Sequence, residues 1–334
     1  MRQAIVKQGL NVHIEDSPIP EPNADQIVIK VIASGVNPKD WKLADLFGLS
    51  MVPGDDVAGV IHQVGSNVTE FKPGDRVAAF HGPGEPHGTF AEYTVVQANT
   101  TFRLPDKISF EEASTIPLAA FTAASGLYLH LRLPTPWLPS PETAEPIPLV
   151  IYGASSGVGA FAIQLARRSN IHPLICVAGK SHSFVETLID RSKGDTIIDY
   201  RDGDLAANIE HALQGRKLLH VFEAVSASPS DEVLQRVLAP GGTMAQILHS
   251  FEKEYKIVRD DVTCTATDVR RVFTDSQDFG FVLGRYLGKA LQDGWFKPHP
   301  HQVVDGGLGG VHDALLSLKE GKASAFKYVL RIGE

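Results

Sequence analysis

The sequence predicts an α/β protein with two domains, a compact barrel-like β domain and a doubly wound parallel sheet. Short strand patterns separated by glycine and proline turns fill the first third of the chain. Strand and helix patterns then alternate from residue 149 to residue 248, as they do in a parallel sheet. The length of 334 residues also exceeds what one ordinary hydrophobic core accommodates.

The first predicted domain is built from short strands, of which residues 27–33 follow a period of two most clearly. These strands are predicted at 4–7, 12–15, 27–33, 57–64 and 76–80. A helix interrupted at Pro117 is predicted over 110–130. The proline-rich stretch that follows, 134–148, is predicted to be an exposed loop.

The second predicted domain has the rhythm of βαβ units. Its strands are predicted at 149–152, 172–177, 196–199, 218–223 and 243–248, and its helices at 156–169, 183–191, 205–213 and 231–238. A tail adds helices at 279–293 and 311–319 and strands at 301–304 and 327–331, the last of which is expected to return to the first domain. We therefore predict one domain from residues 1–120 and 265–334 and another from 121–264.

The composition argues against two classes of partner. The net charge is −8 without a lysine or arginine block, so no nucleic acid partner is expected. No apolar run reaches the ~20 residues that cross a bilayer, so no membrane partner is expected. Residues 1–11 lack a signal-peptide layout, and the expected location is cytoplasmic. Cys176 and Cys264 are too few for a four-thiolate zinc site.

The most informative segment is 149–159, where an apolar strand runs into a glycine-rich turn and then a helix. Small residues would let the backbone approach a pyrophosphate, and the helix N-terminus would attract its charge. The turn departs from the usual Gly-x-Gly-x-x-Gly motif, because Ala154 and Ser156 occupy the first two glycine positions. A plain βα turn is the alternative, but the order of strand, turn, helix and strand favours a dinucleotide.

The end of the next strand indicates which dinucleotide is bound. An NAD enzyme usually carries Asp or Glu there to hold the ribose 2′-hydroxyl. Residues 177–182 contain no acid, whereas Lys180 and Ser181 would suit a 2′-phosphate. Lys180 would otherwise be an ordinary solvated lysine, so the missing acid is the firmer reason to predict NADPH.

With these residues in hand, the chain resembles the medium-chain dehydrogenase/reductase superfamily over nearly its whole length. Four stretches carry the resemblance together: 54–68, 71–77, 88–93 and 149–159. The resemblance implies a GroES-like β-barrel catalytic domain and a Rossmann domain with a doubly wound parallel sheet. It also implies an active site in the cleft between them.

Within the superfamily the chain resembles the zinc-independent quinone and enoyl reductases. Zinc alcohol dehydrogenases carry a cysteine in the segment that corresponds to 36–40, a histidine where this chain has Asp55, and a four-cysteine lobe. His81 and His87 lie in a suggestive loop, but solvated loop histidines are the simpler interpretation. No metal ligand is therefore predicted.

The resemblance extends to the ToxD-like and lovastatin-type trans-acting enoyl reductases of fungal polyketide pathways. Residues 37–42 match their Asn-Pro-x-Asp-x-Lys motif, and the proline-rich insert and the Asp-Tyr-Arg stretch at 199–201 also match. The cofactor contacts that this implies lie in the glycine-rich turn within 149–159, which we call the cradle, in the loop after the strand at 172–177, and in four further stretches. They are Lys39, Asp40, Trp41, Lys42, Ser155, Ser156, Gly157, Val158, Lys180, Ser181, His182, Ser183, Tyr200, Ile247, Leu248, Ser324 and Ala325.

Without a metal, the accessible chemistry is hydride addition to an electron-poor double bond, which needs donors at the carbonyl oxygen and a proton source. The catalytic candidates are Lys42, Asn37 and Asp40. Their alternatives are a solvated helix lysine and an acid favoured by a helix N-terminus. By resemblance, Phe121 and Thr122 would bind substrate, with a packed helix face as the alternative.

The sequence thus predicts an NADPH-dependent, zinc-independent oxidoreductase that reduces an activated C=C bond in an enoyl thioester or enone. The substrate would be a small molecule, such as an acyl chain presented by a carrier or a polyketide synthase. An NADPH:quinone oxidoreductase, a non-catalytic NADPH-binding protein and a zinc alcohol dehydrogenase with unusual ligands are the alternatives. Monomer and homodimer both remain open.

Overall fold

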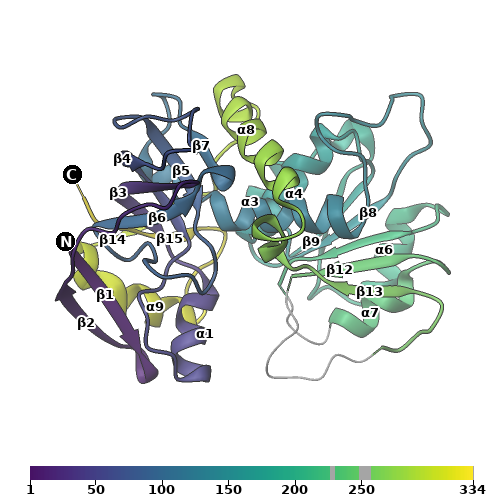
Figure 1. The fold of residues 1–334 in the computed structure, drawn as a ribbon. Coiled ribbons are helices and arrows are strands. Elements are labelled where there is room, and N and C mark those ends of the chain that lie inside the picture. The colour runs from purple at the N-terminus through teal and green to yellow at the C-terminus, as the bar shows by residue number, and fades with distance from the viewer. Residues whose placement is uncertain (226–229, 248–256, 334) are drawn as a thin grey trace. The chain divides into compact units, whose positions relative to one another are not determined.

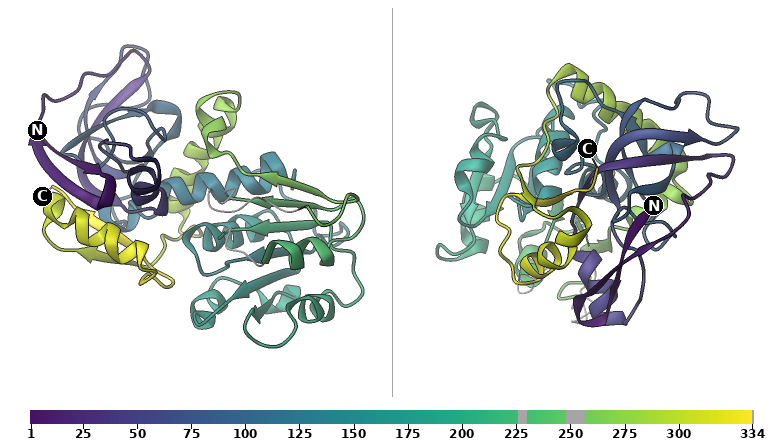
Figure 2. Two further views of the ribbon diagram at one scale, coloured as in Figure 1. Left: turned by 90° about the horizontal axis from the view of Figure 1, so that it is seen from below. Right: turned by 90° about the vertical axis from the view of Figure 1, so that its left-hand side faces the viewer.

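The computed structural model describes residues 1–225, 230–247 and 257–333. Its contacts divide the chain into two units, Met1–Phe121 with Arg270–Glu334, and Thr122–Val269. Both chain termini belong to the first unit (Figures 1 and 2). The predicted second domain ended at residue 264, whereas the sheet of the second unit continues through Ala266 because an additional strand joins it.

The first unit is organised around β3 (Gln26–Gly35), a long and almost entirely buried strand. One edge of β3 pairs with β4, and its other edge pairs with β6 in its first half and with β15 in its second half. The last strand therefore returns to this unit, as predicted. The remaining strands are β1 (Arg2–Lys7), β2 (Asn11–Asp16), β4 (Asp56–Val64), β5 (Arg76–Phe80), β6 (Tyr93–Gln97), β7 (Thr101–Arg103), β14 (His301–Val304) and β15 (Lys327–Arg331).

The helices of the first unit, together with residues 122–130 at the start of the second, correct one prediction. The helix expected over 110–130 is broken into α2 (Phe110–Ala113), α3 (Pro117–Ala124) and a π-helical turn, Ser125–His130. Pro117 is the reason, because proline is disfavoured inside a helix but suits its first turn. The other helices are α1 (Pro38–Phe47), which was not predicted, α8 (Gln277–Asp293) and α9 (Val311–Lys319).

The second unit holds a six-stranded, all-parallel sheet in the order β10-β9-β8-β11-β12-β13. Figure 1 labels β8, β9, β12 and β13 of this sheet. Numbered from its first strand, this is the order 3-2-1-4-5-6 of dinucleotide-binding sheets. The strands are β8 (Leu149–Tyr152), β9 (Leu174–Ala178), β10 (Thr196–Asp199), β11 (His220–Glu223), β12 (Thr243–Gln246) and β13 (Thr263–Ala266). The helices are α4 (Gly157–Arg168), α5 (His182–Glu186), α6 (Leu205–Leu213) and α7 (Ser230–Val237).

Two element predictions in this unit were wrong at their ends. The predicted helix 183–191 stops early, because Asp190 caps a separate short turn, Arg191–Lys193, with its own side chain. The predicted strand 172–177 starts later, because Pro173 lacks the N–H that a ladder needs. The strand β13 was missed because its four residues carry no long apolar run.

A buried carboxylate closes the amino-terminal edge of the parallel sheet. Asp195 is 2% exposed and accepts hydrogen bonds from His172 Nδ1 at 2.7 Å, Leu174 N at 2.8 Å and Asp190 N at 2.9 Å. It thereby ties the start of β9 to the turn before β10. A cavity of about 160 Å³ opens at the same edge, lined by residues such as Pro146, His172 and Arg216. Parallel sheets bind cofactors at their opposite, carboxyl edge, so this cavity is separate from the cradle.

Within the part of the chain that the structure describes, no helix is long and apolar enough to cross a membrane.

Candidate active site

The cradle between β8 and α4 has the geometry that a dinucleotide needs. Ser156 is the N-cap of α4, and its Oγ accepts a hydrogen bond from Gly159 N at 3.0 Å. Gly157 and Val158 lie ahead of the point where helical hydrogen bonds satisfy backbone N–H groups. Both are only partly buried, as is Ser155. The cradle therefore offers backbone donors and the positive end of a 12-residue helix.

Two glycines of the cradle stand where no side chain fits. Gly153 has φ of +77°, and a Cβ added there would lie 2.1 Å from Val225 Cγ2. A Cβ at Gly159 would lie 2.3 Å from the carbonyl oxygen of Gly153. Gly153 directly follows β8, and Val225 lies just after β11. The strand order of the sheet reverses between these two neighbouring strands. The cradle thus lies at the switch point where α/β sheets bind ligands.

The carboxyl ends of β9 and β10 place the predicted phosphate-binding residues beside the cradle. The Tyr200 ring lies 6.2 Å from the Tyr152 ring, and its Cε1 lies 3.0 Å from a Cβ added at Gly179. Lys180 and Ser183 are exposed, while Ser181 and His182 are partly buried. No carboxylate ends β9, because Ala178 and Gly179 occupy that position. The structure therefore brings these predicted residues to one edge of the sheet.

Arg201 is a residue that the sequence reasoning omitted, although it follows Tyr200 directly. Its guanidinium binds Asp199 through Nε at 2.8 Å and through Nη2. These hydrogen bonds hold the pKa of Asp199 well below its ordinary value. His182 Nε2 lies 3.7 Å from the same carboxylate. Arg201 is thus a second cation held near the loop that carries Lys180.

In the first unit, the motif at 37–42 starts α1. Asn37 is the N-cap and Pro38 the first helical residue. Asn37 N donates to Asp40 Oδ2 at 2.7 Å, and Asp40 N donates to the carbonyl oxygen of Asn37 at 3.0 Å. Asp40 is fully buried. The acid therefore serves the helix N-terminus, as the alternative interpretation of Asp40 expects.

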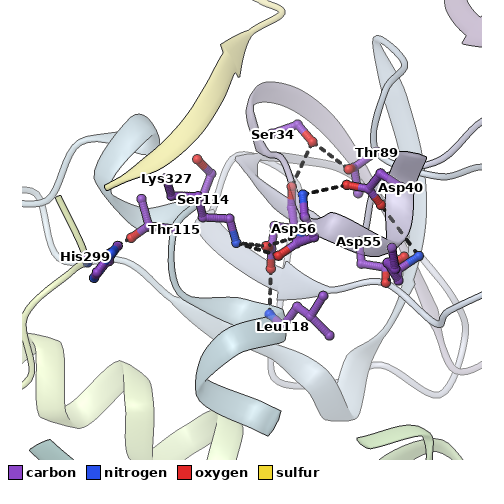
Figure 3. Close-up of polar contacts among 12 residues, drawn as sticks. Ser34, Asp40, Asp55, Asp56, Thr89, Ser114, Thr115, Leu118, His299 and Lys327 are labelled. Carbon is purple, nitrogen blue, oxygen red and sulfur yellow. Dashed lines mark hydrogen bonds and ion pairs between the residues drawn. The ribbon is translucent and has the colours of Figure 1, made fainter. Parts of the chain in front are cut away.

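Lys39 is partly exposed and lies against the buried Asp40, Asp55 and His81, and we call these four residues the Lys39 cluster. Lys39 Nζ lies 2.8 Å from Asp55 Oδ2 and 3.6 Å from Asp40 Oδ1. Figure 3 labels these two carboxylates. His81 Nδ1 lies 3.7 Å from Asp55 Oδ1. Its Nε2 lies 3.0 Å from the carbonyl oxygen of Pro86. One ammonium thus lies between two carboxylates that are almost completely removed from water.

Burial and pairing act in opposite directions on these groups. Burial lowers the pKa of Lys39, but Asp55 and Asp40 outweigh it and hold that pKa above its ordinary value. Burial alone would raise the pKa of Asp55, but Lys39 and His81 bring it below its ordinary value. For Asp40 burial prevails over Lys39 and raises the pKa to about 7. Lys39 and Asp55 are therefore a charged pair, and Asp40 is the group that titrates near neutral pH.

The two segments in which zinc alcohol dehydrogenases place a cysteine and a histidine do come together. They meet as the ion pair of Lys39 and Asp55 rather than as a pair of metal ligands. Among residues 1–225, 230–247 and 257–333, no three His, Cys, Asp or Glu side chains are arranged to hold a metal ion. Zinc independence itself stays a prediction.

A second buried group, which we call the Asp56 cluster, consists of Asn37, Asp56, Leu118 and Lys327. Asp56 Oδ2 accepts from Asn37 Nδ2 at 2.8 Å and from Lys327 Nζ. Asp56 Oδ1 accepts from Leu118 N at 2.5 Å (Figure 3). Burial and the Lys327 charge lower the pKa of nearby His299 to about 4, so this imidazole is neutral at pH 7. The Asp56 carboxylate joins α1, α3 and β15.

The other predicted contacts differ in accessibility. The Lys42 amino group lies 5.6 Å from the centroid of the Trp41 ring and has no ion-pair partner among the described residues. Ser324 is exposed, and Ala325 has φ of +54°. Ile247 follows β12, while Leu248 lies outside the described residues.

The two predicted substrate residues are buried. Phe121 is fully buried with its ring 5.7 Å from that of Phe80, and Thr122 is 7% exposed. In this structure they belong to the packed face of α3, and their contact with a substrate stays a prediction.

Comparison with known proteins agrees with this geometry. Residues 23–106 match the alcohol dehydrogenase GroES-like domain. The chain superposes over 99% of its length on the CurK enoyl reductase, with 99% of that chain covered, a TM-score of 0.78 and 21% identity. A quinone oxidoreductase of Pseudomonas syringae superposes over 98% of this chain and 100% of its own, with a TM-score of 0.77 and 22% identity. The fold is that of the medium-chain dehydrogenases/reductases.

The relatives by sequence are more specific. The chain is 45% identical to trans-enoyl reductase fsr4 of Gibberella fujikuroi, over 93% of this chain and 92% of that protein. It is 31% identical to trans-enoyl reductase ACTTS2 of Alternaria alternata, over 99% of both. The chain belongs to the trans-enoyl reductase family.

We expect Gly159→Ala to abolish binding of a nicotinamide cofactor and to lower the free energy of unfolding by about 1–3 kcal/mol, because the added methyl meets backbone. Isothermal titration with NADPH and urea denaturation measure the two effects. Gly309→Ala is the control, since a Cβ there meets nothing within 4 Å. Binding retained by the Gly159 variant would contradict the assignment of the cradle.

We expect Asp40→Asn to flatten the pH dependence of stability. The folded-state pKa of Asp40 is raised from 3.8 to about 7, so between these values the folded protein binds more protons than the unfolded chain. The contribution of Asp40 to the free energy of unfolding is therefore most favourable below pH 4, and it declines as the pH rises to 7. Each pKa unit corresponds to about 1.4 kcal/mol. Denaturation of wild type and variant at pH 4 to 8 measures this, and parallel curves would refute it.

Proposed function

We propose that this chain is an NADPH-dependent enoyl reductase that transfers hydride to the activated C=C bond of an enoyl thioester. The substrate would be an acyl chain that a carrier or a polyketide synthase presents in trans. The observation that supports this most directly is the β8–α4 cradle, with its two close-packed glycines, in a chain that belongs to the trans-enoyl reductase family. Members of this family use a nicotinamide cofactor. That the cofactor carries a 2′-phosphate, and so is NADPH, is part of our proposal.

The residues at the carboxyl edge of the sheet fit the phosphorylated cofactor. Lys180 is exposed, and Arg201 is held in place by Asp199 two residues before it. A carboxylate that would repel the 2′-phosphate is absent from the end of β9, which the structure describes completely. Tyr200 is about half exposed, so its ring is available to contact the cofactor. Together these groups would provide cations and a flat apolar surface.

The first unit would provide the donors for the reduction. NADPH, when bound, supplies the hydride for the β-carbon of the enoyl group. Negative charge then develops on the thioester carbonyl oxygen, and Lys42 would donate to it because no carboxylate of the described residues pairs with its amino group. Asn37 and Asp40 make their hydrogen bonds inside the protein. We therefore assign them to fixing the N-terminus of α1, which carries Lys42. The proton for the α-carbon would come from Lys42 or from water.

A comparison of three acceptors tests the function. Purified protein is given NADPH with the crotonyl thioester of N-acetylcysteamine, with cyclohexenone or with benzoquinone, and the absorbance of NADPH is followed. We expect the largest kcat/KM for the thioester. Faster reduction of the quinone would favour the quinone reductase alternative. NADPH that binds without oxidation by any acceptor would favour a non-catalytic protein.

We expect Lys180→Ala to raise the KM for NADPH about tenfold, because a charge-assisted hydrogen bond to the 2′-phosphate is lost. The KM for NADH should change less than about twofold in the same variant. Steady-state kinetics with both cofactors measure this, with Lys193→Ala as the control on the turn before β10. An equal rise for both cofactors would remove Lys180 from phosphate recognition.

We expect Lys42→Ala to lower kcat about 100-fold, the loss typical of one donor to a developing oxyanion. Its melting temperature should change little, because a cation–π contact between two partly exposed side chains contributes only about 1 kcal/mol. Lys319→Ala is the matched control, since Lys319 Nζ also lies 5.6 Å from the Trp41 ring centroid. Equal turnover of the two variants would exclude a catalytic role for Lys42.

A further inference from the structure

The Asp56 carboxylate is shared by three segments that are far apart in the sequence. It is fully buried and accepts hydrogen bonds from Asn37 Nδ2, Leu118 N and Lys327 Nζ. Figure 3 shows the Leu118 N–H and the Lys327 amino group reaching it from two different elements. Lys327 Nζ also donates to Asn37 Oδ1 at 3.0 Å. The side chains of Asp56, Asn37 and Lys327 are therefore each hydrogen-bonded to the other two. The bond from Leu118 N connects this group to α3.

Each of the three segments carries residues that are predicted to contact the cofactor or the substrate. Asn37 is the N-cap of α1, whose first turns hold Lys39 to Lys42. Leu118 is the second residue of α3, which leads to Phe121. Lys327 starts β15 directly after the segment with Ser324 and Ala325. Ala325 has φ of +54°, a conformation that a non-glycine residue adopts only where its surroundings hold it.

Only a carboxylate can satisfy this arrangement. All three atoms that reach Asp56 are hydrogen-bond donors, and they use both carboxylate oxygens. An amide would turn its NH₂ group towards at least one of these donors. The backbone of Asp56 is fixed as well, since Ser34 Oγ donates to its carbonyl oxygen at 3.0 Å and lies 2.6 Å from Thr89 Oγ1. The position of the carboxylate is thereby set by β3 and β4.

We propose that Asp56 is a positioning residue that fixes the α1, α3 and 324–327 segments relative to one another for cofactor binding and hydride transfer. This rests on the proposed function, which places Lys42 of α1 in the site, and on the predicted contacts of Phe121, Ser324 and Ala325. Asp56 itself is fully buried, so it acts through Asn37, Leu118 and Lys327 rather than by touching a ligand. This positioning role explains why a charged carboxylate is maintained in the interior, close to where α1, α3 and β15 begin.

The test compares Asp56→Asn with Asp195→Asn. Asp195 is also a buried carboxylate with three hydrogen-bond donors, but it lies at the amino edge of the parallel sheet in the other unit. Both variants should lose melting temperature. We expect only Asp56→Asn to weaken NADPH binding in isothermal titration and to lower kcat, each about tenfold, because site residues are displaced. Equal kinetics and equal NADPH affinity in the two variants would overturn the proposal.

A second variant covers the case in which Asp56→Asn does not fold. In Asp56→Asn/Lys327→Gln no unpaired charge is buried, yet the second acceptor for Leu118 or Asn37 is still missing. The same loss of affinity and kcat is expected, and wild-type values in this variant would overturn the proposal. Wild-type protein that fails to bind NADPH would instead overturn the proposed function. The titration needs no turnover, so the two failures are distinguishable.

Discussion

The first unit depends on charges that are buried only because each one is paired. Asp55, Asp56 and Lys327 are removed almost completely from water, and an isolated ion in such a place would cost several kcal/mol. The cost is offset because each carboxylate faces an ammonium group and, in Asp56, because the other oxygen accepts a hydrogen bond from Leu118 N. Loss of one partner of such a pair typically costs about 3–5 kcal/mol. The same contacts that stabilise the unit therefore also determine where α1 begins.

The second unit solves a different problem with uncharged groups. The turn after β8 lies where the strand order of the parallel sheet reverses. The helix α4 begins at this turn, and its first backbone N–H groups have no partner within the helix. Alternate residues such as Val150, Ile175 and Val221 pack against Ile209 of α6 and Leu234 of α7. This apolar packing holds the strands at a fixed spacing, so Gly153 and Gly159 can approach each other closely. The result is a close-packed corner, residues 153–159, which has no charged side chain of its own and which we propose binds the pyrophosphate.

The sequence predicted the features that local periodicity and turn chemistry determine. The strand β8, the cradle and the strands β10 and β15 lie where the pattern placed them, because apolar runs ended by Gly or Asp are unambiguous. The identity of the catalytic candidates in residues 37–42 came from a motif, but their surroundings did not. Asp55, Asp56 and Lys327 are far from that motif in the sequence, and only the pairing of β3, β4 and β15 brings them to it. Arg201 was missed because its role depends on a side-chain contact with Asp199 rather than on a pattern.

The contact between Gly179 and Tyr200 restricts how this protein could change its coenzyme. An enzyme selective for the unphosphorylated coenzyme would carry an acid near the end of β9, which is the position of Gly179. Any side chain at Gly179 starts 3.0 Å from Cε1 of Tyr200, so the ring would have to move aside. An acid introduced at Gly179 would therefore need the half-exposed Tyr200 ring to shift or to be replaced. The preference for NADPH that we propose would then depend on two residues from the ends of neighbouring strands, and not on one position alone.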